Sequence, residues 1–390
     1  MIPKFLTQTL LAATTTLVAF HSSVSAALAS SLELRVAIEE NVGSVRVGSS
    51  VDAIVKNGSG QVLGEIKGMN GFTANSGGSG VSLDRWSASR IVVEPKDPNG
   101  VVWIGSRWYR GKAALVPTSG GLTAVNYVDL EAYLASVLGG EMNGNWPQEA
   151  LKAQAVAARS YALFRRNRDG NGNFDLCDTA QCQVYRGIQD ESAGTQSAVL
   201  ATAGQVLTYR GQIIEALFHS SSGGPDGGHT ENVEDVWGSK VPYLRAVRDY
   251  DSSSPVASWT KVVSRSELGN AVGLGPIDAV NPVGSPTKGG SFRQLEFVSG
   301  GRRKRIKTEE LRDRFNLRSS KVTIVPQPSQ VKSNNKGNVA AMFEIRGNGF
   351  GHGLGMSQYG AKALAEQNVS YDRIVLHYFQ GTELRRIDPQ

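Results

Sequence analysis

The chain has 390 residues, 40% of them hydrophobic and 19% charged, with a formal net charge of +6. This composition is typical of a soluble globular protein, and the length allows one large domain or two ordinary ones. No segment after residue 26 is apolar enough to cross a bilayer, which excludes a protein built from membrane helices.

The N-terminus has the pattern of an export signal. Lys4 precedes an apolar run from Phe5 to Phe20, and small residues at positions 24 and 26 form a cleavage site. We expect residues 1–26 to be removed and the mature protein to act in the periplasm or cell wall, with no stable membrane span. A retained leader would instead tether it to the membrane. Because an exported chain meets little nucleic acid, we expect no nucleic-acid partner.

Residues 27–106 predict a β-rich region. Short alternating runs such as ELRVAI and RIVVEP are separated by Gly, Asn, Ser and Pro, which is the pattern of strands and hairpins. The glycine-rich piece from Gly68 to Gly80 predicts a loop within this region.

Two helices are predicted next, over Leu130–Val137 and Pro147–Arg168. The second carries an alanine-rich stripe, which predicts close packing against another backbone such as the later glycine-rich block, and Asn145 is its expected N-cap. Between them, Glu141 follows a Gly139-Gly140 turn. A lone carboxylate facing such a helix suits general acid/base chemistry, although an exposed turn glutamate is the commoner fate of a single Glu.

The later sequence mixes both kinds of element. Residues 197–220 predict a helix followed by strands, and residues 256–341 predict a β-rich segment with one helix, Thr308 to Phe315. Further helices are expected over Ser357–Glu366 and Tyr371–Tyr378. Strands early and a mixture later predict the α+β class.

The only two cysteines, Cys177 and Cys182, lie close together in the loop DLCDTAQC. In an oxidising compartment we expect a disulfide between them. The alternative is a zinc site completed by His219 or His229. We expect no other cofactor.

Two glycine-flanked blocks carry further polar residues. In FHSSSGG (Phe218–Gly224), the serines and backbone N–H groups suit sugar hydroxyls, although an ordinary serine-rich turn has the same composition. In GNGFGHGLGMSQYGAKALA (Gly347–Ala365), alternate glycines let a chain or ligand approach closely. Ser357 lies in a sequence close to the serine-hydrolase elbow, but Tyr359 stands where that motif needs glycine.

These blocks resemble the signatures of the stage II sporulation protein D / amidase-enhancer family. Glu141-Met142 with Ala150–Ala162 is similar to one signature, and Gly347–Ala365 is similar to the other. CQVYRG (Cys182–Gly187) and FHSSSGG also fit. The resemblance runs from about Tyr109 to the C-terminus and is weakest between residues 256 and 341. Some members hold zinc near the cysteine loop, which keeps the metal alternative open.

The resemblance implies that residues 107–390 form one catalytic domain, with mixed helices and strands around a single catalytic cleft. It also implies a lytic transglycosylase that cleaves peptidoglycan glycan strands stripped of stem peptides. Glu141 matches the family's catalytic position and would act first as acid and then as base, leaving 1,6-anhydro-muramic ends. Lys152 or Arg159 is expected to hold a substrate carboxylate. The substrate-site candidates are Lys152, Gln154, Arg159, Tyr161, His219, Ser221, Ser222, His352, Ser357, Gln358 and Tyr359.

Two other functions stay open. The second name of the family implies a non-catalytic wall-binding protein that activates a cell-wall amidase, an N-acetylmuramoyl-L-alanine amidase, as its partner. A serine hydrolase would act through Ser357, with His219 or His352 as base. Substitution of Glu141 tests the first alternative, and substitution of Ser357 tests the second.

Overall fold

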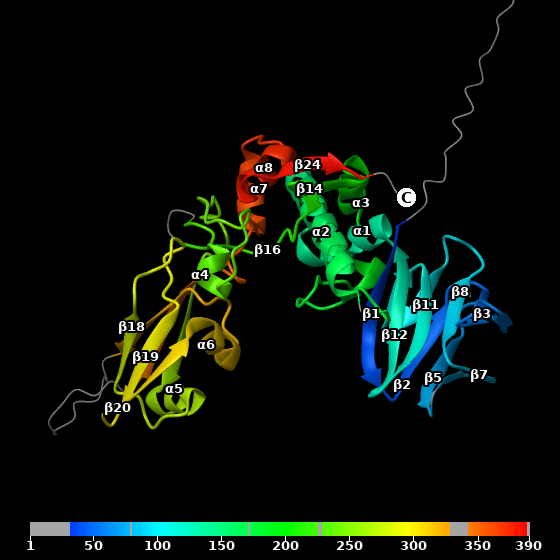
Figure 1. Ribbon diagram of the computed structural model, residues 1–390, viewed down its shortest axis with the longest axis horizontal. Coiled ribbons are helices and arrows are strands. Elements are labelled where there is room, and N and C mark those ends of the chain that lie inside the picture. The colour runs from blue at the N-terminus through cyan, green and yellow to red at the C-terminus, as the bar shows by residue number, and fades with distance from the viewer. Residues whose placement is uncertain (1–31, 79, 171, 225–227, 328–341, 388–390) are drawn as a thin grey trace, which may run out of the picture.

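The computed structural model describes residues 32–78, 80–170, 172–224, 228–327 and 342–387. The predicted export signal therefore lies outside the described residues. The protein belongs to the α+β class and its N-terminal part is rich in strands, so the predicted fold class is confirmed (Figure 1). Within the described residues no helix is both long and apolar enough to span a membrane.

Two sheets pack face to face in the N-terminal part and share one hydrophobic core, because alternate residues of each strand are apolar and point inward. The first sheet contains, in order, β13 (Leu176–Cys177), β1 (Glu33–Val42), β12 (Gly121–Asp129), β11 (Lys112–Thr118), β8 (Ile91–Pro95), β3 (Ala53–Asn57) and β4 (Val62–Ile66). The second contains β10 (Arg107–Arg110), β9 (Val101–Ile104), β2 (Ser44–Ser49), β5 (Gly71–Gly77), β6 (Gly80–Leu83) and β7 (Trp86–Ala88).

Two expectations for this region differ from the structure. The loop predicted over Gly68–Gly80 is mostly strand β5, because its residues pair with β2 and Ala74 is buried in the core. The boundary expected after residue 106 falls between β9 and β10, which pair with each other as a hairpin, and the strands continue to Asp129.

A helical layer follows the sheets, with α2 at its centre (Figure 1). Its elements are α1 (Leu130–Glu141), α2 (Gln148–Asp169), the short 3-10 helix η1 (Gly187–Asp190), α3 (Ala193–Ala201), α7 (Gln358–Glu366) and α8 (Tyr371–Tyr378). A small sheet, ordered β15 (Gln212–Ile213), β14 (Gln205–Tyr209) and β24 (Glu383–Arg386), lies beside them. The helix α2 contacts α1, α3, α7, α8 and β14. Because nearly all of α7 lies within the block Gly347–Ala365, α2 packs against the helical end of that block as well as against other helices.

The N-cap prediction for α2 is wrong. The N-cap is Pro147, without a side-chain cap bond, and the backbone N–H of Asn145 instead donates to the side chain of Asn143 over 2.9 Å. By contrast, α1 is capped by Asp129, whose carboxylate accepts from the N–H groups of Glu131 and Ala132.

The segment from residue 258 to residue 348 builds a separate hydrophobic core around Phe297, Leu311 and Phe343. It contains one sheet of β17 (Ser258–Ser264), β22 (Met342–Asn348) and β21 (Val322–Gln327), another of β18 (Ala279–Val283), β19 (Gln294–Ser299) and β20 (Arg302–Lys307), and the helices α5 (Arg265–Val272) and α6 (Thr308–Phe315). The helix α4 (Val233–Trp237) and the parallel pair β16 (Phe218–His219) and β23 (Met356–Ser357) lie between this segment and the helical layer (Figure 1).

Candidate functional site

Glu141 is the last residue of α1 and not, as predicted, a residue that follows a glycine turn. The glycines at positions 139 and 140 are helical, and a side chain on either would collide with a neighbouring segment. A Cβ atom at Gly139 would lie 1.8 Å from the carbonyl oxygen of Asp190, and one at Gly140 would lie 2.7 Å from that of Val184. The glycine pair therefore lets residues 184–190 pack directly against the helical turn that ends in Glu141.

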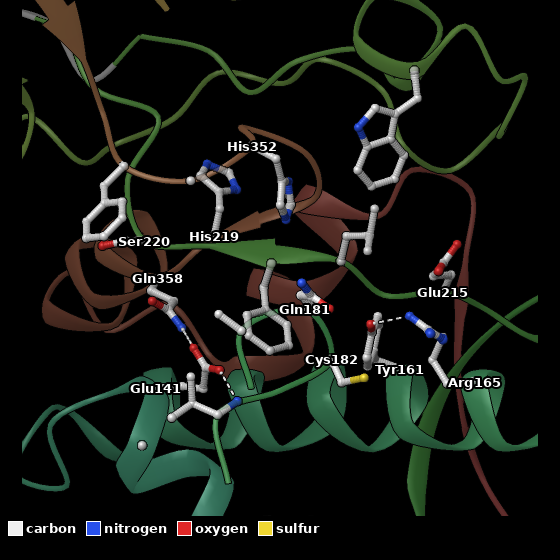
Figure 2. A pocket seen from close by; sticks show the side chains of 18 of the residues that line it. Glu141, Tyr161, Arg165, Gln181, Cys182, Glu215, His219, Ser220, His352 and Gln358 are labelled. Carbon is white, nitrogen blue, oxygen red and sulfur yellow. Dashed lines mark hydrogen bonds between the residues drawn. The ribbon is translucent and has the colours of Figure 1, made fainter. Parts of the chain in front are cut away.

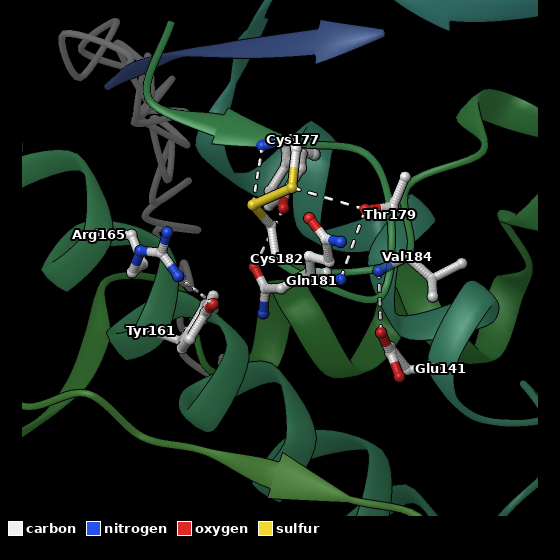
Figure 3. Close-up of a disulfide and its surroundings, with 10 residues drawn as sticks. Glu141, Tyr161, Arg165, Cys177, Thr179, Gln181, Cys182 and Val184 are labelled. Atoms are coloured by element: carbon white, nitrogen blue, oxygen red, sulfur yellow. Dashed lines mark hydrogen bonds between the residues drawn. A yellow bond between two sulfur atoms is a disulfide. The ribbon is translucent and has the colours of Figure 1, made fainter. Parts of the chain in front are cut away.

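Two hydrogen bonds fix the Glu141 carboxylate. The backbone N–H of Val184 donates to Oε1 over 2.9 Å, and the side-chain amide of Gln358, the first residue of α7, donates to Oε2 over 3.3 Å (Figures 2 and 3). Burial raises the pKa of Glu141, and the two hydrogen bonds oppose this by favouring the charged form. The outcome is a carboxyl group that is held in one orientation and retains its proton at a higher pH than an exposed glutamate.

Glu141 lines a pocket of about 630 Å³ that lies between the helical layer and the segment with the second core. One wall comes from α1, α2 and the cysteine loop, and the other comes from the two glycine-flanked blocks, α4 and α6. Five of the predicted site residues meet in this pocket, namely Glu141, Tyr161, His219, His352 and Gln358 (Figure 2).

Of the two histidines in the pocket, His219 is buried and His352 is half-buried, and both are held in their neutral form. Nδ1 of His219 donates to the carbonyl oxygen of Leu354 over 3.0 Å, so its Nε2 accepts from the hydroxyl of Ser222 over 3.0 Å. Nδ1 of His352 accepts from the N–H of Leu354 over 3.0 Å. Burial lowers the pKa of each imidazole to about 3. Neither ring therefore carries the second proton that an imidazolium would need to act as a general acid near neutral pH.

The candidate serines hold the walls together and do not line the pocket. Ser221 donates to Asp251, Ser222 donates to His219, and the hydroxyl of Ser357 caps α7 by accepting from the N–H of Gly360 over 3.1 Å. Because Ser357 is fully buried in this cap, the structure gives no support to a serine nucleophile at that position.

Three candidates from α2 lie outside the pocket, contrary to prediction. Arg159 is completely buried and forms a bidentate ion pair with Glu131 at 2.9 and 2.6 Å. Lys152 pairs with Glu149 at 2.7 Å, and Gln154 is buried within the helical layer. The sequence could not reveal this, because the ion pair of Arg159 crosses to another helix. Tyr359 also lies outside the pocket lining, with its ring 4.9 Å from that of Trp146.

The sequence analysis missed several pocket residues. Arg165 could have been found, because it lies four residues after Tyr161 on one face of α2, and it donates to the Tyr161 hydroxyl over 2.8 Å (Figures 2 and 3). Phe350 lies within the block Gly347–Ala365 but was not among the candidates. Glu215, Trp237, Glu309 and Arg312 come from segments without a recognisable motif.

Cys177 and Cys182 form a disulfide, with their Cα atoms 5.5 Å apart (Figure 3). Among the described residues no group of three or more His, Cys, Asp and Glu side chains is placed to hold a metal ion. His219 is bonded to Leu354 and Ser222, and the backbone of His229 accepts from the buried Lys321 over 2.8 Å. The zinc alternative therefore does not fit, since the sulfur atoms are bonded to each other and both histidines lie elsewhere.

Comparison with known proteins places these residues in a family context. Residues 118–209, which include Glu141 and α2, match the family described as "Stage II sporulation protein". The chain is 32% identical to stage II sporulation protein D of Bacillus subtilis (strain 168), covering 68% of this chain and 77% of that protein. It is 34% identical to stage II sporulation protein D of Bacillus amyloliquefaciens, with 68% and 76% covered. It is also 32% identical to the amidase enhancer of Bacillus subtilis, covering 64% of this chain and 40% of that protein.

Proposed function

The chain belongs to the stage II sporulation protein D family, and on that premise we propose that it is an exported lytic transglycosylase that cleaves peptidoglycan glycan strands, with Glu141 as its single acid/base. One observation carries the proposal. Glu141 is half-buried and burial raises the pKa of its carboxyl group, in a pocket where both histidines are in the neutral form. A raised pKa lets such a group keep its proton to a higher pH than an exposed glutamate does and give it to a leaving group.

The proposed reaction needs no second carboxylate. Protonated Glu141 donates to the glycosidic oxygen as the bond between that oxygen and C1 of N-acetylmuramic acid breaks. The resulting carboxylate then accepts the proton of the 6-hydroxyl of the same sugar, whose oxygen bonds to C1 and closes the 1,6-anhydro ring. No water is consumed, and Glu141 ends protonated again. Ordinary glycosidases use two carboxyl groups about 5–10 Å apart. Glu215 also lines the pocket, but it lies beside Tyr161 and Arg165, away from Glu141 (Figure 2).

The substrate is proposed to be glycan stripped of its stem peptides. Removal of the peptide leaves a free carboxylate on the lactyl group of each N-acetylmuramic acid. Lys152 and Arg159 cannot reach it from the positions described above, whereas Arg165 and Arg312 line the pocket. Either guanidinium would pair with this carboxylate, because the planar group of arginine suits bidentate binding of carboxylates.

The location of the protein is part of the proposal. The leader of residues 1–26 would direct it to the periplasm or cell wall, and retention of that leader would tether it to the membrane. The likeness to an amidase enhancer supports a cell-wall amidase as a partner.

Activation of an amidase without catalysis is the second candidate function, and the same likeness favours it. The two are separated by replacing Glu141 with Gln, which keeps the size and the hydrogen-bonding reach of the side chain but removes its acid/base chemistry. Loss of general acid/base catalysis costs about 10²–10⁴-fold in rate.

The test is mass spectrometry of peptide-free glycan strands after incubation with the full mature protein. We expect 1,6-anhydro products from the wild type, almost none from Glu141→Gln, and wild-type amounts from Glu366→Gln, a matched change of an exposed glutamate on α7. Wild-type rates of release by Glu141→Gln would contradict the assignment. Undiminished amidase stimulation by that variant, with no glycan cleavage by the wild type, would establish the second function instead.

A further inference from the structure

Two exposed aromatic rings face the pocket from the wall opposite Glu141. The side chains of Trp237 and Phe350 are 49% and 45% exposed, and both line the pocket. Of the large hydrophobic side chains that are exposed among the described residues, only these two are aromatic. Large apolar side chains left exposed together in one cleft mark a binding surface more often than chance exposure does.

The backbone around Phe350 is fixed even though its ring is exposed. Phe350 and Ser221 exchange two backbone hydrogen bonds, at 2.8 and 3.1 Å, which tie the two glycine-flanked blocks together. Gly349 and Gly351 on either side have positive φ angles of 74° and 111°. A Cβ at Gly351 would also lie 2.7 Å from the Cβ of His219. The glycines thus allow a tight path of the chain that leaves the intervening ring directed away from the core.

Trp237 is held in a similar way. It is the last residue of α4, which ends at Gly238 in the left-handed conformation, with φ of 74°. Arg293 donates to the carbonyl oxygens of Glu234 and Val236 over 3.0 and 3.2 Å, which anchors this short helix. The indole ring centre lies 5.9 Å from the centre of the His352 ring, which in turn lies 5.7 Å from that of His219. A row of fixed rings therefore leads from Trp237 into the pocket.

We propose that Trp237 and Phe350 form a stacking platform for pyranose rings of the glycan, on the side of the cleft opposite Glu141. One face of a pyranose ring carries mainly C–H groups, which pack well against the face of an aromatic ring. The same pocket supplies the polar groups that such a ligand requires around its rim, among them Ser220, Glu309 and Arg312. A mostly apolar wall with a few directed polar groups is the usual composition of a ligand site.

The platform rests on the proposed function, because it extends the glycan site beyond the bond that is cleaved. It accounts for a feature that acid/base chemistry leaves unexplained, namely why rings held on rigid backbone remain exposed to water. It also assigns a purpose to α4 and the glycine pair beside Phe350, which have no part in proton transfer.

Binding is measured apart from catalysis in the Glu141→Gln variant of the full mature protein. The probe is a peptide-free oligosaccharide of alternating N-acetylglucosamine and N-acetylmuramic acid, and the method is isothermal titration calorimetry. We expect Trp237→Ala and Phe350→Ala each to raise Kd about tenfold, as loss of one stacking contact would. Trp237→Phe and Phe350→Tyr, which keep an aromatic face, should recover most of the affinity. Leu200→Ala on α3 and Leu376→Ala on α8, both exposed outside the pocket, are matched controls and should not change Kd.

Kinetics of the same substitutions in the active protein give a second measure. If the platform binds the glycan equally well in the ground state and in the transition state, loss of either ring should raise KM and leave kcat nearly unchanged. Kd values within about twofold of the control for both alanine variants, with unchanged thermal unfolding, would overturn the platform. A failure of the proposed function alone would give another result. The oligosaccharide would still bind, and binding would still weaken on loss of Trp237 or Phe350, but the wild type would release no 1,6-anhydro product.

Discussion

The side-chain amide of Gln358 donates a hydrogen bond to Oε2 of Glu141 over 3.3 Å, across 217 positions of the sequence. This contact joins the first residue of α7 to the last residue of α1. It stabilises the ionised form of the carboxyl group, and burial acts in the opposite direction. Burial on one side, and the bonds from Val184 and Gln358 on the other, together determine the pH at which Glu141 loses its proton.

Replacing Gln358 with Met is therefore predicted to raise the pKa of Glu141 further, because the methionine has a similar length but no N–H donor. The alkaline limb of the pH–rate profile for kcat/KM should move to higher pH, since Glu141 then stays protonated longer. We also expect a lower maximal rate, because one of the two bonds that orient the carboxyl group is lost. Gln367→Met at the C-cap of α7 is the control and should leave the profile in place. A shift of the limb to lower pH would contradict the role given to Gln358.

A second prediction links the raised pKa of Glu141 to stability. The folded protein keeps the Glu141 proton at pH values where the unfolded chain has already released it, so the unfolded state binds fewer protons and stability falls as pH rises toward the folded pKa. Glu141→Gln removes this penalty. Its thermal midpoint should exceed that of the wild type at about pH 8, and the difference should disappear below about pH 4, where the carboxyl group is protonated in both states. Glu366→Gln should show no comparable pH dependence, since that side chain is exposed on α7. An equal midpoint at both pH values would mean that the pKa of Glu141 is not raised.

The third prediction concerns Arg159, which the sequence had placed at the substrate. Arg159→Met removes a buried guanidinium that binds Glu131 through two bonds and donates to the carbonyl oxygen of Gln205 over 3.0 Å. Breaking such a pair costs about 3 kcal/mol, the low end of the usual range because the Glu131 carboxylate is partly exposed. Urea unfolding should show this loss, whereas KM for the proposed glycan cleavage should stay unchanged in the folded variant. Arg373→Met, on the exposed side of α8, should affect neither quantity. A large increase in KM without loss of stability would restore Arg159 to the substrate site.

The fourth prediction concerns the disulfide. Replacing both Cys177 and Cys182 with Ser removes the disulfide that closes a small loop, and this cross-link contributes about 2 kcal/mol to the free energy of unfolding. The loop leads into Val184, whose N–H holds Glu141, so activity should fall along with stability (Figure 3). The wild type treated with a reducing agent should behave like the double variant, and the double variant itself should not respond to that agent. Full activity of the double variant would show that the loop keeps its shape without the cross-link.

The sequence pattern predicted the amphipathic helices well. The observed bounds of α6 and α8 equal the predicted ones, and α7 begins one residue later because Ser357 is its cap. The eight-residue helix α5 was missed, although Ser264 and Glu267 form a capping box at its start. Length does not explain this, because α6 and α8 are equally short. The apolar residues of α5 gather less clearly on one face, which weakens the helical pattern in its sequence.

The site was predictable where motif residues carry it and unpredictable where tertiary contacts decide. Glu141, His219, His352 and Gln358 lie in blocks with a recognisable pattern, and the fold brings all four into one pocket. Arg159 also lies in such a block, yet its partner on α1 keeps it in the core. Trp237 and Phe350 could not be told from ordinary apolar residues, because their exposure follows from the way that distant segments meet.

The pairing of β16 with β23 and the contact of Gln358 with Glu141 also determine the order in which the pocket can form. Synthesis starts at the N-terminus, so the two N-terminal sheets and Glu141 are made early. The wall that completes the pocket lies more than 200 positions later in the sequence. Contacts of such long sequence separation form late in folding. A newly made chain therefore carries an incomplete site until the block from Gly347 to Ala365 has been made and has packed against α1 and α2, which delays any activity until that point.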